Sequence, residues 1–145
     1  MIRDPDWTPA LAWTPPQLRI LYLEDEAIIA METSQVLRDL GFEQIAAAAS
    51  LAGAEKALAE GMPDLALLDV SIGRAGLSSL DLAAKLLEAG VPVVLATGHT
   101  AFELKADPRA CVLEKPFSPD DLEAALRRAV SSRGGRGGHT ATAAQ

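Results

Sequence analysis

The stretch LALLDVSIG, residues 65–73, runs from four apolar residues directly into an aspartate, Asp69. A short apolar run of this kind is typical of a strand that is buried on both faces. A chain that needed only to end such a strand could use Gly, Asn or Ser. The presence of a carboxylate at this point raises the question of which other residues reach the same place.

The segments on either side of this stretch alternate between strand and helix patterns. Apolar runs predict five strands, at residues 19–23, 44–49, 65–68, 93–96 and 110–113. Helical spacing and boundary residues predict helices over residues 26–41, 50–61 and 77–90, and a last helix that opens at Ser118. In the third of these helices, Leu80, Ala83, Ala84 and Leu87 are expected to share one face. Alternation of this kind predicts an α/β fold whose parallel sheet is covered by helices on both sides.

Local signals support two of the helix ends. Gly41 stands where a glycine commonly ends a helix, at the end of the 26–41 pattern. The sequence SPDD places Ser118 as the N-cap of the last helix, Pro119 at its first position and Asp121 three residues after the cap. The boundaries of these two helices are therefore predicted from capping chemistry as well as from periodicity.

Polar residues follow four of the five predicted strands. They are Glu24–Glu26, Asp69, Thr97–Gly98 and Glu114–Pro116. In parallel sheets of this class, binding and chemistry take place beyond the carboxyl ends of the strands. Clustered carboxylates need a cation, and oxygen ligands suit Mg²⁺. An aspartate beside such a metal can act as a nucleophile toward phosphorus, with Thr97 and Lys115 placed to contact the phosphoryl oxygens.

Four of these motifs, taken in order, resemble the receiver domain of two-component response regulators. They are LYLEDE, LALLDV, LATG and EKPF, and the resemblance covers roughly residues 18–130. The resemblance implies a flavodoxin-like, doubly wound, five-stranded parallel sheet in the strand order 2-1-3-4-5. It also implies that Asp69 accepts a phosphoryl group from a histidine kinase or a phosphotransfer protein.

The resemblance further implies a Mg²⁺ site at the phosphoacceptor. Asp25 matches the residue that binds the metal directly, and Glu24 matches the residue that acts through water. Asp69 itself and the backbone carbonyl of Ser71 match the remaining protein ligands.

Beside the metal, Thr97 matches the switch hydroxyl and Lys115 the family's lysine, with Lys115–Pro116 as the expected cis peptide bond. The Ala-Thr-Gly motif at residues 96–98 resembles a subclass of stand-alone, single-domain receivers. Gly98 and His99 then belong to a possible switch loop.

The expected domain organisation has three parts. Residues 1–16, which hold Trp7 and Trp13, form an N-terminal extension, and the tryptophans either dock onto the domain or stay exposed. The receiver domain covers residues 17–132, and residues 133–145 form a flexible tail rich in Gly and small polar residues. Within the domain, the short span from Thr97 to Lys115 predicts a fourth helix that is short or partly disordered.

Composition excludes several classes of function. A net charge of −7 argues against general nucleic-acid binding, which needs a basic surface. With one cysteine, Cys111, the chain has no intramolecular disulfide and no cysteine-based metal site. The first residues lack the pattern of a signal peptide, and no apolar run reaches the ~20 residues that cross a bilayer. We therefore expect a cytoplasmic protein that does not insert into membranes.

The resulting prediction is a signalling module rather than a conventional enzyme. It catalyses only its own phosphorylation and dephosphorylation and acts through a downstream protein partner. The alternative is a pseudo-receiver, a protein-binding module that works without phosphorylation. A metal-dependent phosphatase of the haloacid dehalogenase type is disfavoured, because such enzymes have a second Asp where this chain has Ser71.

Overall fold

The computed structural model describes residues 12–70, 79–98 and 106–132. A 3-10 helix, η1 (Pro15–Gln17), precedes the first strand. The other elements are, in chain order, β1 (Arg19–Leu23), α1 (Ala27–Asp39), β2 (Gln44–Ala48), α2 (Leu51–Glu60), β3 (Leu65–Asp69), α3 (Ser79–Glu88), β4 (Val93–Thr97), β5 (Cys111–Glu114) and α5 (Pro119–Ser132). Each predicted strand is present, with bounds that differ from the prediction by at most one residue at either end.

The five strands form one parallel sheet in the order β2-β1-β3-β4-β5. Every residue of β3 and β4 is buried, which explains why these two strands read as unbroken apolar runs. The strand order and the parallel pairing confirm the predicted flavodoxin-like α/β fold.

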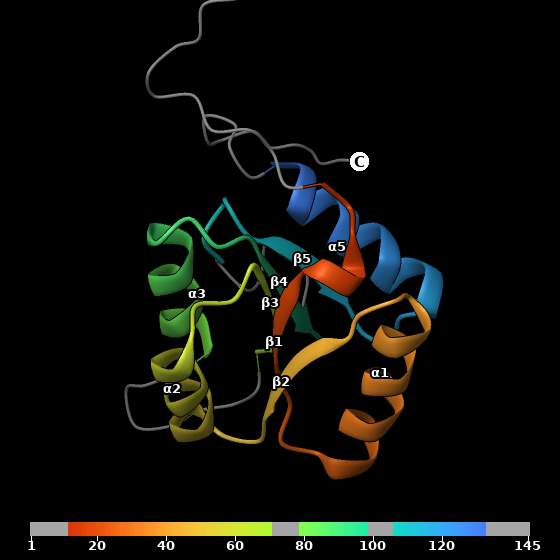
Figure 1. The fold of residues 1–145 in the computed structure, drawn as a ribbon, viewed down its shortest axis with the longest axis horizontal. Coiled ribbons are helices and arrows are strands. Elements are labelled where there is room, and N and C mark those ends of the chain that lie inside the picture. The colour runs from red at the N-terminus through yellow and green to blue at the C-terminus, as the bar shows by residue number, and fades with distance from the viewer. Residues whose placement is uncertain (1–11, 71–78, 99–105, 133–145) are drawn as a thin grey trace, which may run out of the picture.

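Helices cover both faces of the sheet, with α1 and α5 on one side and α2 and α3 on the other (Figure 1). The core is accordingly divided into two clusters. One contains Leu37, Leu122 and Leu126 packed against Ile20 and Leu67. The other contains Ala54, Leu82 and Leu86 packed against Ala66 and Leu68. Alternate side chains of each central strand thus enter opposite clusters.

The predicted caps are present. The Asp121 backbone N–H donates to Ser118 Oγ at 3.0 Å, and the Ser118 N–H donates to the Asp121 carboxylate at 3.0 Å. This reciprocal pair is a capping box in which Asp takes the usual place of Glu. Gly41, with φ +110°, follows the end of α1.

The face assigned to the third helix needs a correction. In α3 the buried residues include Leu82, Ala83 and Leu86, whereas Leu80 and Leu87 are only partly buried. The buried face is therefore centred on Leu82 and Leu86, and Leu80 and Leu87 pack against the same cluster from its edges. The predicted set contained Ala83 but otherwise lay on the edges of this face.

Several expectations fall on residues that lie outside the described ones. These are Trp7 and most of the 1–16 extension, the 133–145 tail, and most of the expected fourth helix, since residues 99–105 are not described. Trp13 is described and is partly buried against the α1–α5 side of the core. Among the described residues, no helix is both long and apolar enough to cross a membrane.

Gly41→Ala is expected to destabilise the fold more than Gly90→Ala. Both glycines have a positive φ, +110° and +87°, which costs an alanine about 1–2 kcal/mol. A Cβ at Gly41 would also lie 3.3 Å from Pro15 Cβ, whereas nothing lies within 4 Å of a Cβ at Gly90. Urea unfolding of both variants measures the difference. Equal losses would contradict the tight packing of Pro15 against this turn.

Candidate functional site

The register of the sheet brings the four polar strand ends to one edge. Leu23 pairs with Leu68, so Glu24 follows β1 at the level where Asp69 ends β3. Asp69 in turn pairs with Ala96, which places Thr97 one residue further along β4. Parallel strands end on the same side, so residues distant in the sequence meet here.

Asp69 is the centre of this group and is 3% exposed. Lys115, the residue that follows β5, donates a hydrogen bond from its Nζ to Asp69 Oδ1, and the two atoms are 3.0 Å apart. The Lys115 backbone N–H donates to the Thr97 carbonyl at 2.8 Å, which fixes the start of the Lys115 side chain next to β4. The peptide bond between Lys115 and Pro116 is cis, as expected. The ammonium therefore balances the charge of a carboxylate that has little contact with water.

Three carboxylates gather at this point. Oxygen atoms of Glu24, Asp25 and Asp69 all lie within 4.8 Å of one another. Glu24 is buried and accepts a hydrogen bond from the Glu26 backbone N–H at 3.2 Å, whereas Asp25 is exposed. Burial raises the pKa of the Glu24 carboxyl above its ordinary value, and the negative charge of Asp69 raises it further. The cluster is thus a site of unfavourable negative charge.

The donor set fits a divalent cation. Mg²⁺ takes oxygen ligands, usually one or two carboxylates together with water and phosphate oxygens. The buried carboxylates of Glu24 and Asp69 and the exposed carboxylate of Asp25 provide such ligands. A cation bound among them would offset their mutual repulsion. Glu24, Asp25 and Asp69 are the residues that would hold it.

The remaining predicted site residues divide between described and undescribed segments. Thr97 is 2% exposed and Gly98 follows it as an exposed residue at the same edge of the sheet. Ser71, whose carbonyl was expected to be a ligand, lies outside the described residues, and so does His99.

One neighbour of the site was missed by the sequence analysis. Tyr22 lies on β1 two residues before Glu24 and is buried in the core cluster that includes Leu37 of α1. Burial raises the pKa of Tyr22 to about 12, and the charges of Glu24 and Asp69 add to the rise. Side chains two residues apart on a strand point to the same face, so the position of Tyr22 two residues before Glu24 could have indicated this neighbour.

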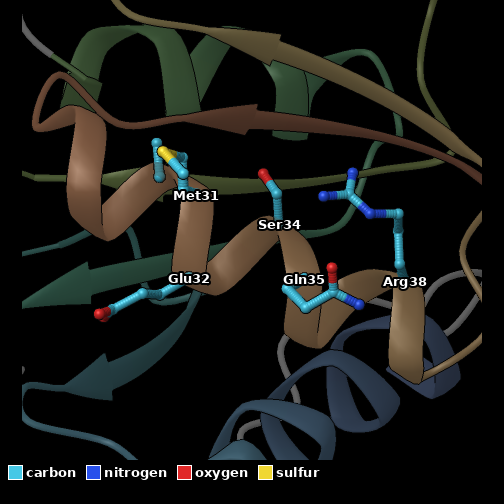
Figure 2. A pocket seen from close by; sticks show the side chains of 6 residues that line it. Met31, Glu32, Ser34, Gln35 and Arg38 are labelled. Carbon is cyan, nitrogen blue, oxygen red and sulfur yellow. The ribbon is translucent and has the colours of Figure 1, made fainter.

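An open pocket lies on the outer surface of α1 (Figure 2). The residues that line it all belong to this helix, namely Ala30, Met31, Glu32, Ser34, Gln35 and Arg38. Met31 is 71% exposed. Because this pocket shares no lining residue with the carboxylate cluster, the candidate site is the strand edge and not the pocket.

Comparison with known proteins agrees with this geometry. The family model described as the response regulator receiver domain matches residues 20–127. The transcriptional regulatory protein PdtaR of Mycobacterium tuberculosis is 32% identical over 118 residues, which are 78% of this chain and 57% of PdtaR. The phyllosphere-induced regulator PhyR of Methylorubrum extorquens is 31% identical over 116 residues, which are 77% of this chain and 43% of PhyR. The chain thus spans about half the length of these curated relatives.

Solved structures show the same similarity. The receiver domain of PhyR from Erythrobacter litoralis has a TM-score of 0.70 at 26% identity, over 84% of this chain and 96% of that one. A response regulator receiver protein from Sinorhizobium medicae has a TM-score of 0.71 at 29% identity, over 80% of this chain and 96% of that one.

Proposed function

We propose that this chain, which belongs to the response regulator receiver family, accepts a phosphoryl group on Asp69 from the phosphohistidine of a histidine kinase or phosphotransfer protein. The observation that carries the proposal is the environment of the Asp69 carboxylate. It is buried, lies 3.0 Å from the Lys115 ammonium and belongs to a cluster of three carboxylates. This environment combines a nucleophile, a fixed cation and ligands for a metal.

The transfer is a nucleophilic displacement at phosphorus. An oxygen of the Asp69 carboxylate forms the new bond to phosphorus while the bond from phosphorus to the donor imidazole nitrogen breaks. The electron pair of the broken bond stays on the imidazole. Burial of Asp69 holds the attacking oxygen in one place and limits the access of water.

Lys115 and Thr97 would act on the transferred group. The ammonium supplies positive charge next to the oxygens that gain negative charge, and the Thr97 hydroxyl can donate a hydrogen bond to one of them. A bound Mg²⁺, held by Glu24, Asp25 and Asp69, would supply further positive charge. The same residues can orient a water molecule that later hydrolyses the aspartyl phosphate. The module would thus catalyse only its own phosphorylation and dephosphorylation.

The intact mass of the full chain, after incubation with acetyl phosphate, tests this proposal. With Mg²⁺ present we expect a gain of one phosphoryl group, and with EDTA in place of Mg²⁺ we expect none. Beryllofluoride binding, measured in parallel by ¹⁹F NMR, detects a competent site even where hydrolysis is fast. A chain that neither gains mass nor binds beryllofluoride would support the alternative, a pseudo-receiver that binds proteins without phosphorylation.

The proposed output is a change of a protein-binding surface. Phosphorylated Asp69 would draw Thr97 toward the new oxygens, shift the 98–109 segment and alter the surface near α5 for a downstream protein partner. The Ala96-Thr97-Gly98 motif, which resembles that of stand-alone receivers, supports an output by protein contact. NMR shifts of Gly98 and of residues 106–110 in the same samples check this step, and unchanged shifts would contradict it.

A further inference from the structure

Residues 12–18, here called the N-terminal strap, contact α5 and the turn after α1. The Trp13 ring meets the Phe42 ring edge-on, with centroids 5.8 Å apart and an interplanar angle of 87°. On α5, the Arg127 guanidinium carbon lies 4.7 Å from the centroid of the Trp13 ring. Both geometries are within the range of attractive aromatic and cation–π contacts. Trp13 therefore links the turn after α1 to α5.

The rest of the strap is anchored to the domain. Pro15 is buried at the start of η1 and lies against Gly41. Gln44 Nε2 donates to the Pro16 carbonyl at 3.4 Å, and Leu18 is 5% exposed in the core. These contacts fix the backbone of the segment that follows Trp13. The Trp13 ring is therefore kept next to α5.

The helix that Trp13 holds leads back to the candidate site. α5 begins at Pro119, four residues after Lys115, so the two are joined by a very short connection. Phe117 in this connection packs against the same core cluster as Trp13 and the α5 residues Leu122 and Leu126. The Lys115 backbone is thus held on one side by its hydrogen bond to the Thr97 carbonyl and on the other by the packing of α5, which the strap contacts.

We propose that the N-terminal strap restrains α5 in the position that pairs Lys115 with Asp69, and so opposes occupation of Asp69 by a phosphoryl group. This inference rests on the proposed function. A phosphoryl group adds oxygens beside the Asp69 carboxylate, so the ammonium now 3.0 Å from Oδ1 has to move to pair with them. A contact that favours the present arrangement lowers the affinity for a ligand that favours the other.

Binding of beryllofluoride in the presence of Mg²⁺ to the full chain, followed by ¹⁹F NMR, tests the proposal. Trp13→Ala is expected to bind beryllofluoride about fivefold more tightly than the parent, the low end of typical couplings between sites. Arg127→Gln keeps the strap but removes the cation from the Trp13 ring, together with the Arg127–Glu123 ion pair, and is expected to show a smaller change in the same direction. Arg128→Gln is the control for net charge, because it makes the same charge change on α5 and leaves the contact between Arg127 and Trp13 in place. It is expected to leave the affinity unchanged.

The outcomes separate this proposal from the one on which it rests. If the parent binds beryllofluoride and Trp13→Ala binds it equally or more weakly while still folded, the strap does not restrain the site and the present inference is wrong. If Arg128→Gln tightens binding as much as Arg127→Gln, the effect comes from charge and not from Trp13, which also overturns it. If the parent binds no beryllofluoride, the proposed phosphoryl function fails and the inference fails with it.

Discussion

Replacement of Asp69 by asparagine is expected to abolish the gain of a phosphoryl group from acetyl phosphate. An amide oxygen is a far weaker nucleophile than a carboxylate, while the side chain keeps its size and can still accept a hydrogen bond from Lys115 Nζ. The fold should persist. We expect the free energy of unfolding to change by no more than about 1 kcal/mol, because relief of the repulsion with Glu24 is offset by loss of the ion pair with Lys115. Intact mass and urea unfolding measure the two effects.

Asp64→Asn is the matched control, because it makes the same change at the other end of the same strand. Asp64 precedes β3 and accepts a hydrogen bond from the Arg19 backbone N–H at 2.8 Å, a role that an amide oxygen can also fill. This variant should gain the phosphoryl group as the parent does. If Asp69→Asn still gains mass, the acceptor lies elsewhere, and fragmentation of the phosphorylated chain would show whether Asp25 or Glu24 carries the group.

The arrangement of the candidate site was largely predictable because a parallel sheet gathers its strand ends. Glu24, Asp69, Thr97 and Lys115 each follow or end an apolar run, and runs of this kind are readable from sequence. Alternation of strands with helices then requires that the strands be parallel, so these residues had to share one edge. The structure places Lys115 and Asp69 in direct contact, as this logic requires.

Contacts that depend on how a helix is rotated, or on where a segment outside the regular elements lies, were less predictable. In α3, residues 82 and 86 face the sheet where the pattern favoured 80 and 87, because adjacent apolar positions on a short helix define its inner face only to within about one residue. Trp13 was as compatible with an exposed arm as with a docked one. Its partners, Phe42 and Arg127, are far away in sequence, and no local pattern relates them to Trp13.

Lys115→Met is expected to slow phosphoryl uptake from acetyl phosphate by about 100-fold, the usual cost of removing one preorganised stabilising group. Methionine keeps the apolar stem and removes only the ammonium. The folded state should also lose about 1.5–3 kcal/mol, the typical contribution of a hydrogen bond to a charged group, because the buried Asp69 carboxylate loses this partner. The initial rate of mass gain, measured where the variant is fully folded, separates the two effects.

Lys85→Met is the matched control for this prediction. Lys85 pairs with Glu55 at 3.2 Å on the surface, where both side chains are more than half exposed, so its loss should change stability by less than about 1 kcal/mol and the rate not at all. A Lys115→Met variant that is destabilised but phosphorylated at the parent rate would make Lys115 a structural counter-charge only. Positive charge at the phosphoryl oxygens would then have to come from the metal alone. Removal of Mg²⁺ would stop phosphoryl uptake, whereas removal of the Lys115 ammonium would leave its rate unchanged.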